Sequence, residues 1–181
     1  MNKEINRWQW AGFLFTGLLG VLLHFLYDWL PSPLTAAISG INESTWEPMK
    51  LLFFPMFAFA WIQNRYWKNK PKNFWCVKLY GTLLGLALIP IIFYTFNGAL
   101  GPSPDWYNIA IFFQAAAAGY LLEAALFKRE EPCGPSPAVS IFILCLCALA
   151  FILFTWFPPK IPLFMDPVTG QYGLNNGNLY G

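Results

Sequence analysis

Charged residues are scarce in this chain. Only 11% of its 181 residues are Asp, Glu, Lys or Arg, whereas 57% are hydrophobic. A soluble domain carries about 25% charged residues. The charges are missing from several runs long enough to cross a bilayer, which excludes a large water-soluble domain. A net charge of only +2 gives no electrostatic surface for nucleic acid, and no glycine-rich phosphate-binding loop is present.

Cysteine and histidine are also rare. The chain has one histidine, His24, and four cysteines: Cys76, Cys133, Cys145 and Cys147. Cys145 and Cys147 are two positions apart, so they would point in different directions on a helix. No cysteine lies in a segment predicted to face the outside of the cell. We therefore expect no disulfide and treat the cysteines as small core residues.

Long apolar runs dominate the rest of the sequence. Five of them are long enough to span a membrane as helices: residues 8–30, 45–64, 75–96, 106–127 and 138–157. The second run is the least apolar. It reaches full length if its helix starts at Thr45 with Ser44 as the N-cap, whereas Pro48 in the first turn would give a shorter helix. The sequence predicts an all-α polytopic integral membrane protein, with the lipid bilayer as its main partner.

Basic residues predict the orientation of these spans. Nine of the eleven Lys and Arg residues fall on one side, and only Lys50 and Lys160 fall on the other. Because Lys and Arg are enriched in cytoplasmic loops, we expect the N-terminus inside and the C-terminus outside, in a plasma or inner membrane. Residues 158–181 then form an external tail, which either docks on the outer face or is disordered.

A polar group of residues is predicted at the outer face. His24 and Asp28 lie one turn apart on one face of the first span, and ionisable groups there are costly and typical of functional sites. The short loop should bring Glu43 and Glu47, at the start of the second span, close to them. A histidine with two or three carboxylates is a ligand set for zinc or manganese. Asp166 in the tail is a further contributor.

Structural roles explain the same residues equally well. Glu47 can cap its helix and pair with Lys50 at i+3, and His24 can simply hydrogen-bond to Asp28 or to a backbone carbonyl. The set could also relay protons, because histidine titrates near neutral pH. Three hypotheses therefore remain open: a site with a divalent metal, a proton-coupled transporter or channel component, and a structural membrane protein without catalysis.

Glu123 is a further candidate contributor to the polar site, and it is the other carboxylate predicted inside the membrane, one turn from the cytoplasmic end of the fourth span. It can pair with Lys78, or with Lys128 or Arg129 by extending to the interface. No serine, threonine or cysteine has an evident base beside it, so the sequence does not decide whether the protein is an enzyme. It identifies no protein partner and leaves a homo-oligomer open.

Two stretches carry a resemblance. One contains Asn42-Glu43-Ser44-Thr45-Trp46-Glu47, and the other reads Pro-Leu-Phe-Met-Asp-Pro-Val-Thr-Gly-Gln-Tyr-Gly over residues 162–173. With the helix of His24 and Asp28, they resemble a family of small multi-spanning bacterial membrane proteins of unknown function. A histidine often follows the Trp-Glu pair in that family, whereas Pro48 stands there in this chain. The resemblance implies the fold and a pairing of the two stretches, but no reaction.

Overall fold

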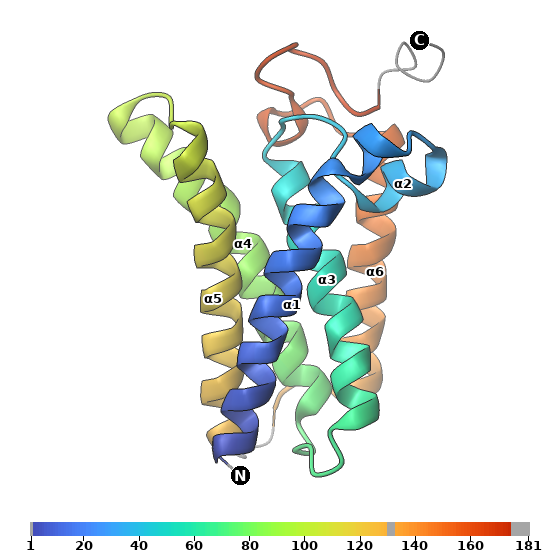
Figure 1. The fold of residues 1–181 in the computed structure, drawn as a ribbon, viewed down its shortest axis with the longest axis vertical. Helices are drawn as coiled ribbons and strands as arrows, with labels where there is room; N and C mark the ends of the chain where they lie inside the picture. Colours follow the sequence, from blue (N-terminus) through green and yellow to red (C-terminus); the bar gives the residue numbers. More distant parts are fainter. Residues whose placement is uncertain (1, 130–132, 175–181) are drawn as a thin grey trace.

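The computed structural model describes residues 2–129 and 133–174, and these residues form an all-helical bundle without strands. Five long helices run along the long axis of the molecule, and a short sixth helix, α2, lies across one end of the bundle (Figure 1). The elements are α1 (Asn2–Trp29), α2 (Pro33–Ile38), α3 (Trp46–Tyr66), α4 (Phe74–Leu100), α5 (Asp105–Arg129), α6 (Pro137–Trp156) and the 3-10 helix η1 (Pro162–Phe164).

The predicted all-helical class is confirmed, and each predicted span falls within a long helix apart from a residue or so at its ends. Helix α1 extends further than predicted, since it begins at Asn2 rather than at residue 8. Helix α2 was not predicted. It forms because the Ser32 hydroxyl accepts a hydrogen bond from the Thr35 amide at 3.2 Å and Pro33 occupies the first turn. The predicted end of the tail, residues 175–181, lies outside the described residues.

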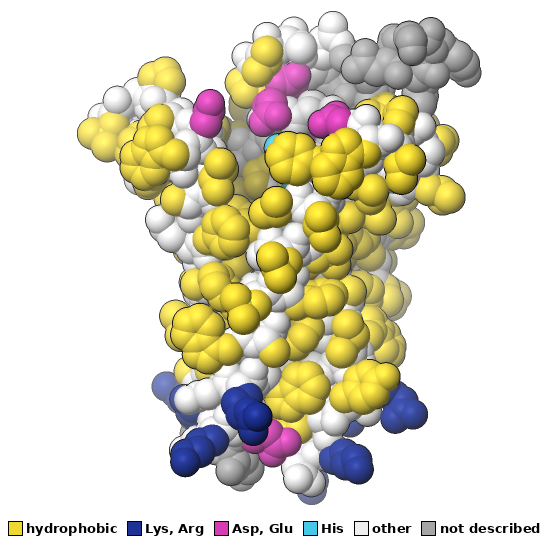
Figure 2. All heavy atoms as spheres, in the orientation of Figure 1, with side chains coloured by type: hydrophobic (Ala, Val, Ile, Leu, Met, Phe, Trp, Pro, Cys, Tyr) yellow, Lys and Arg dark blue, Asp and Glu magenta, His cyan; other side chains and the backbone are white. Residues whose placement is uncertain are grey.

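Most of the basic residues lie at one end of the bundle and most of the acidic residues lie at the other, with an apolar band between them (Figure 2). The basic end comprises the start of α1, the α3–α4 loop and the end of α5, and it carries Lys3, Arg7, Arg65, Lys68, Lys70, Lys72, Lys128 and Arg129. The acidic end comprises the opposite helix ends and residues 158–174, and it carries Asp28, Glu43, Asp105 and Asp166. Helices α1, α4, α5 and α6 are each long and apolar enough to cross a membrane.

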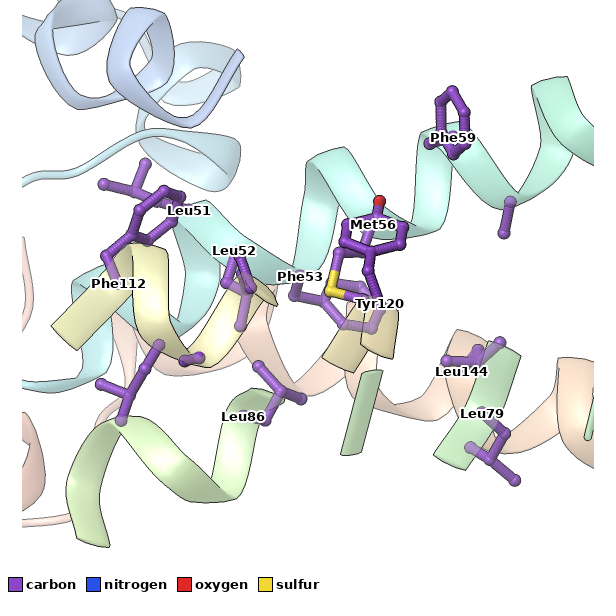
Figure 3. Packing of buried hydrophobic residues seen from close by; sticks show 14 of the residues in the cluster. Leu51, Leu52, Phe53, Met56, Phe59, Leu79, Leu86, Phe112, Tyr120 and Leu144 are labelled. Atoms are coloured by element: carbon purple, nitrogen blue, oxygen red, sulfur yellow. The ribbon is translucent and has the colours of Figure 1, made fainter. Parts of the chain in front are cut away.

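Helix α3 occupies the core of the bundle, in contact with α1, α4, α5 and α6. Its side chains Leu52, Phe53 and Met56 are buried among residues from the neighbouring helices, including Tyr120 of α5 (Figure 3). The polar residues of α3 are buried as well, Glu47, Lys50 and Gln63 among them. This placement explains how α3 can be a long core helix although, unlike α1, α4, α5 and α6, it lacks the hydropathy of a membrane span.

A pair of glycines allows α4 and α5 to pack closely. A Cβ atom at Gly119 of α5 would lie only 2.8 Å from the carbonyl oxygen of Gly81 on α4. Such a distance is well inside normal contact, so Gly119 requires a residue without a side chain. A Cβ atom at Gly81 would lie 2.7 Å from Oε1 of the buried Glu123 side chain, which gives Gly81 the same requirement. Small residues at helix interfaces are the usual means of close packing in lipid.

The expectation that no disulfide forms is wrong. Cys76, in the first turn of α4, is bonded to Cys133, in the connection between α5 and α6, with the Cα atoms 5.9 Å apart. The two residues are 57 positions apart, and the contact arises because α5 returns the chain to the start of α4. Spacing alone could not indicate that meeting. Cys145 and Cys147 of α6 are free.

The disulfide predicts how many thiols can be alkylated. In denatured protein prepared without reductant, we expect a maleimide to modify two of the four cysteines, because sulfur in a disulfide is not alkylated, and to modify all four after reduction. Mass spectrometry of the intact chain gives the count. In a Cys133→Ser control, three cysteines should react under both conditions. Four reactive thiols in the unreduced wild-type protein would contradict the pairing.

Candidate functional site

The structure separates the residues of the predicted metal site. His24 and Asp28 are exposed on α1, Glu43 is exposed on the segment before α3, and the Glu47 residue is only 3% exposed. Within residues 2–129 and 133–174, no three His, Cys, Asp or Glu side chains lie close enough to hold a metal ion together. The predicted neighbours therefore do not form one ligand shell.

A cavity of about 190 Å³ lies at the acidic end, and it joins two of the predicted residues, Glu43 and Asp166. Three segments form its wall: the end of α1, the segment before α3, and the C-terminal segment. The lining residues are Tyr27, Ile41, Asn42, Glu43, Asp166, Val168, Thr169, Gln171, Gly173 and Leu174. The two stretches that carry the family resemblance thus meet here, and the Asn42 side-chain amide donates to the Gly173 carbonyl oxygen at 3.4 Å.

Asp166 organises its own side of the cavity. Its Oδ1 accepts a hydrogen bond from the Val168 amide at 2.9 Å, and its Oδ2 accepts from the Thr169 hydroxyl at 2.7 Å. The Asp166 carbonyl oxygen accepts from the Gly170 amide at 2.8 Å, and Gly170 adopts a positive φ of 69°. This is the turn that the Asp-Pro-Val-Thr-Gly sequence predicts. It holds the carboxylate in the cavity wall.

Tyr27 contributes a buried polar group to the same region. The residue is 6% exposed and lines the cavity. Its hydroxyl has no hydrogen-bond partner within the described part of the chain. A buried hydroxyl without a partner costs free energy, and such groups in native proteins commonly bond to water or a ligand. Tyr27 therefore indicates a polar occupant at this end of the bundle.

Behind the cavity lies a buried ion pair between Glu47 and Lys50. The Lys50 Nζ is 2.8 Å from the Glu47 Oε2, and the two side chains are almost completely buried. The i+3 pairing considered from the sequence is thus present. The predicted N-terminal cap of α3 is absent, since the helix begins after Thr45 without a side-chain cap. The Glu47 Oε2 instead accepts a hydrogen bond from the Ile41 amide at 3.3 Å.

Hydrogen bonds link this ion pair to two of the segments that line the cavity. On one side, Glu47 accepts the Ile41 amide. On the other, the Lys50 Nζ donates to the Thr155 hydroxyl at 3.3 Å, and the Thr155 carbonyl oxygen accepts the Leu174 amide at 3.0 Å. Ile41 and Leu174 both line the cavity. The pair therefore positions the two segments that its hydrogen bonds reach.

A second buried ion pair, Lys78 with Glu123, lies in the basic half of the bundle. Of the partners considered from the sequence, Lys78 is the one present. Glu123 is 0% exposed and so does not extend to the interface. The Lys78 Nζ also lies 5.3 Å from the centre of the Tyr120 ring. The described residues that line the cavity all belong to the acidic end, and neither Lys78 nor Glu123 is among them.

Sequence reasoning missed Tyr27 and Thr155. An aromatic residue near the end of an apolar helix is also typical of the membrane interface, so Tyr27 gave no distinct signal. Thr155 lies at the end of α6, in an apolar run, and its role depends on Lys50 being folded against it. Only a three-dimensional arrangement could identify either residue as part of the cavity region.

Comparison with known proteins gives a family but no activity. No curated protein and no solved structure matches the chain. The chain does match the model of DUF6512, a family of unknown function, over residues 1–174. This range includes all the helices described above and every residue that lines the cavity. The chain therefore belongs to the DUF6512 family.

Proposed function

We propose that the protein is a five-span integral membrane protein that binds a small polar ligand at its outer face. Helices α1, α4, α5 and α6 have the length and hydropathy of spans. Helix α3 is the proposed fifth span, because its 21 residues reach about 30 Å. Its ionisable residues Glu47 and Lys50 face each other inside the bundle instead of facing lipid.

The charge distribution supports the orientation of this bundle. Lys and Arg gather at the end that contains the N-terminus, which by the positive-inside rule is the cytoplasmic end. The Cys76–Cys133 disulfide lies at the same end and is an observation against this orientation, because disulfides are rare in the cytosol. With the basic end inside, the acidic end, with the cavity, faces the outside of a plasma or inner membrane. A ligand reaches the cavity from the external solution without crossing the membrane.

The cavity itself is the observation that carries the proposal. One water molecule needs about 10–15 Å³ of such space, so about 190 Å³ holds a small molecule. The volume is below the 300–1,000 Å³ or so that is typical of pockets for drug-sized ligands. Amide, hydroxyl and carboxylate groups from Asn42, Thr169 and Asp166 stand in its wall. These groups favour a ligand of a few heavy atoms that forms hydrogen bonds.

Binding is better supported than the other hypotheses. The cavity wall contains no imidazole or thiol within the described residues, so it lacks the usual zinc ligands and the usual nucleophile and base. The cavity also ends far from Glu123, which gives no support to a proton path between the two ends. A divalent cation remains one of the occupants that the experiment below compares.

Thermal unfolding tests for an occupant. Purified protein in detergent is heated with tetramethylammonium, tert-butanol or pivalate, three small solutes of different charge, and separately with Ca²⁺ or Zn²⁺. At least one should raise the unfolding midpoint, because a ligand at a hundred times its Kd stabilises by about 2.7 kcal/mol, or about 5 °C or more in a chain of this size.

Two tryptophan variants serve as controls. Gln171→Trp fills the cavity without removing a side-chain hydrogen bond that the structure shows, and it should abolish the rise. Leu34→Trp adds the same side chain at an 83% exposed position of α2, outside the cavity lining, and should leave the rise intact. The proposed function fails if no solute stabilises the protein, or if Gln171→Trp responds as the wild type does.

A further inference from the structure

We infer that the occupant of the cavity is a small organic cation, an alkyl-substituted ammonium. The inference rests on the proposed function, since it identifies the class of ligand for the same cavity. Its first support is charge. Glu43 and Asp166 are the charged residues in the wall, and no Lys, Arg or His lines it within the described part of the chain. The cavity therefore has a negative potential that favours a cation.

The two carboxylates have no cationic partner in the described part of the protein. Among the residues that the structure describes, neither Glu43 nor Asp166 forms an ion pair. The hydrogen bonds to Asp166 come from neutral donors, the Val168 amide and the Thr169 hydroxyl, and leave its charge uncompensated. Lys50, buried behind the wall, is already paired with Glu47. A ligand that carries positive charge would supply the missing partner.

The remaining wall groups favour an organic cation over a metal ion. Ile41, Val168 and Leu174 are apolar residues of the same cavity lining as the two carboxylates. Alkyl groups on nitrogen can contact such surfaces, whereas Ca²⁺ requires six to eight oxygen ligands. The Tyr27 ring adds an aromatic surface, which attracts ammonium groups through cation–π interaction. A volume of about 190 Å³ is also far larger than a bare ion needs.

The solute comparison distinguishes this inference from the proposed function. Tetramethylammonium should raise the unfolding midpoint of the wild type, and its neutral and anionic analogues should not. Glu43→Gln should lower the tetramethylammonium affinity about tenfold, as expected for loss of one nearby unit charge. Asp105→Asn, which removes an exposed carboxylate at the same end but outside the cavity lining, should leave the affinity unchanged.

Each other outcome of that comparison has a definite meaning. Stabilisation by tert-butanol or pivalate instead would overturn the inference that the ligand is a cation, while the proposal of a ligand-binding pocket would stand. Stabilisation by Ca²⁺ or Zn²⁺ alone would replace the organic cation by a metal ion. A tetramethylammonium effect that survives both Glu43→Gln and Gln171→Trp would be a general salt effect and would overturn the inference. No response to any solute would remove the proposed function itself.

Reaction rates of a cysteine in the wall give a second measurement that does not require tight binding. Val168→Cys, with Cys145 and Cys147 replaced by Ala, is exposed to membrane-impermeant methanethiosulfonates, one cationic and one anionic, added outside sealed membranes. After correction for intrinsic reactivity, the cation-to-anion rate ratio should be about tenfold higher at position 168 than at Leu34→Cys. Glu43→Gln should reduce it. Equal ratios at the two positions would overturn the inference.

Discussion

Replacing Glu123 by Gln is expected to lower the free energy of unfolding by about 3–5 kcal/mol. The reason is the environment of Lys78, whose side chain is 2% exposed and whose ion-pair partner is Glu123. Without the carboxylate, the ammonium group would remain buried among the aromatic rings of Phe59, Phe74 and Tyr120. Uncompensated buried charges are among the largest sources of destabilisation by a single substitution.

Unfolding by SDS in mixed micelles, followed by tryptophan fluorescence, measures this effect. Lys78→Met should destabilise to a similar degree, because it leaves the Glu123 carboxylate buried alone. The double variant Lys78→Met with Glu123→Met should recover much of the loss, since an apolar pair of similar volume can replace a buried ion pair. Lys128→Met, at an exposed position of the same helix, should change stability by less than about 0.5 kcal/mol. Losses that simply add in the double variant would refute the pairing.

The long helices could be predicted because each apolar run is at least about as long as the hydrocarbon core of a bilayer, roughly 30 Å, and carries few charges. Helix α3 was the least certain of them, and the structure supplies the reason: Glu47, Lys50 and Gln63 make its sequence more polar, yet all three are buried. Helix α2 has only six residues. A segment of that length is too short to show a helical hydrophobic period. Ser32 therefore could not be recognised from the sequence as the N-cap of a helix.

The candidate site was predicted only in part, because helix periodicity identifies a face but not what covers that face. Gly20 and His24 lie one turn apart on α1, and Gly20 is buried whereas His24 is exposed. Glu43 and Asp166 lay in the two stretches that resemble a known family, but their shared cavity depends on where the tail folds. The disulfide depended on tertiary contact in the same way.

Lys50→Met is expected to have a comparably large effect, about 3–5 kcal/mol, and to disturb the cavity as well. The substitution leaves the Glu47 carboxylate buried without its cation and removes the hydrogen bonds from Lys50 to Thr155 and to the Ala36 carbonyl oxygen. Hydrogen–deuterium exchange read by mass spectrometry should then show faster exchange in peptides that contain the amides of Ile41 and Leu174. Lys160→Met, an exposed position at the same end, should leave both peptides unchanged.

A double variant separates stability from cavity structure. Lys50→Met with Glu47→Leu removes both buried charges, so the free energy of unfolding should recover much of the loss. The Ile41 amide, however, has then lost its acceptor, the Glu47 carboxylate, and its exchange should remain fast. Recovery of stability without recovery of protection would show that the ion pair positions the cavity wall and is not needed for the bundle itself. If the double variant restored slow exchange at Ile41, the wall would be held by packing, and the ion pair would have no part in shaping the cavity.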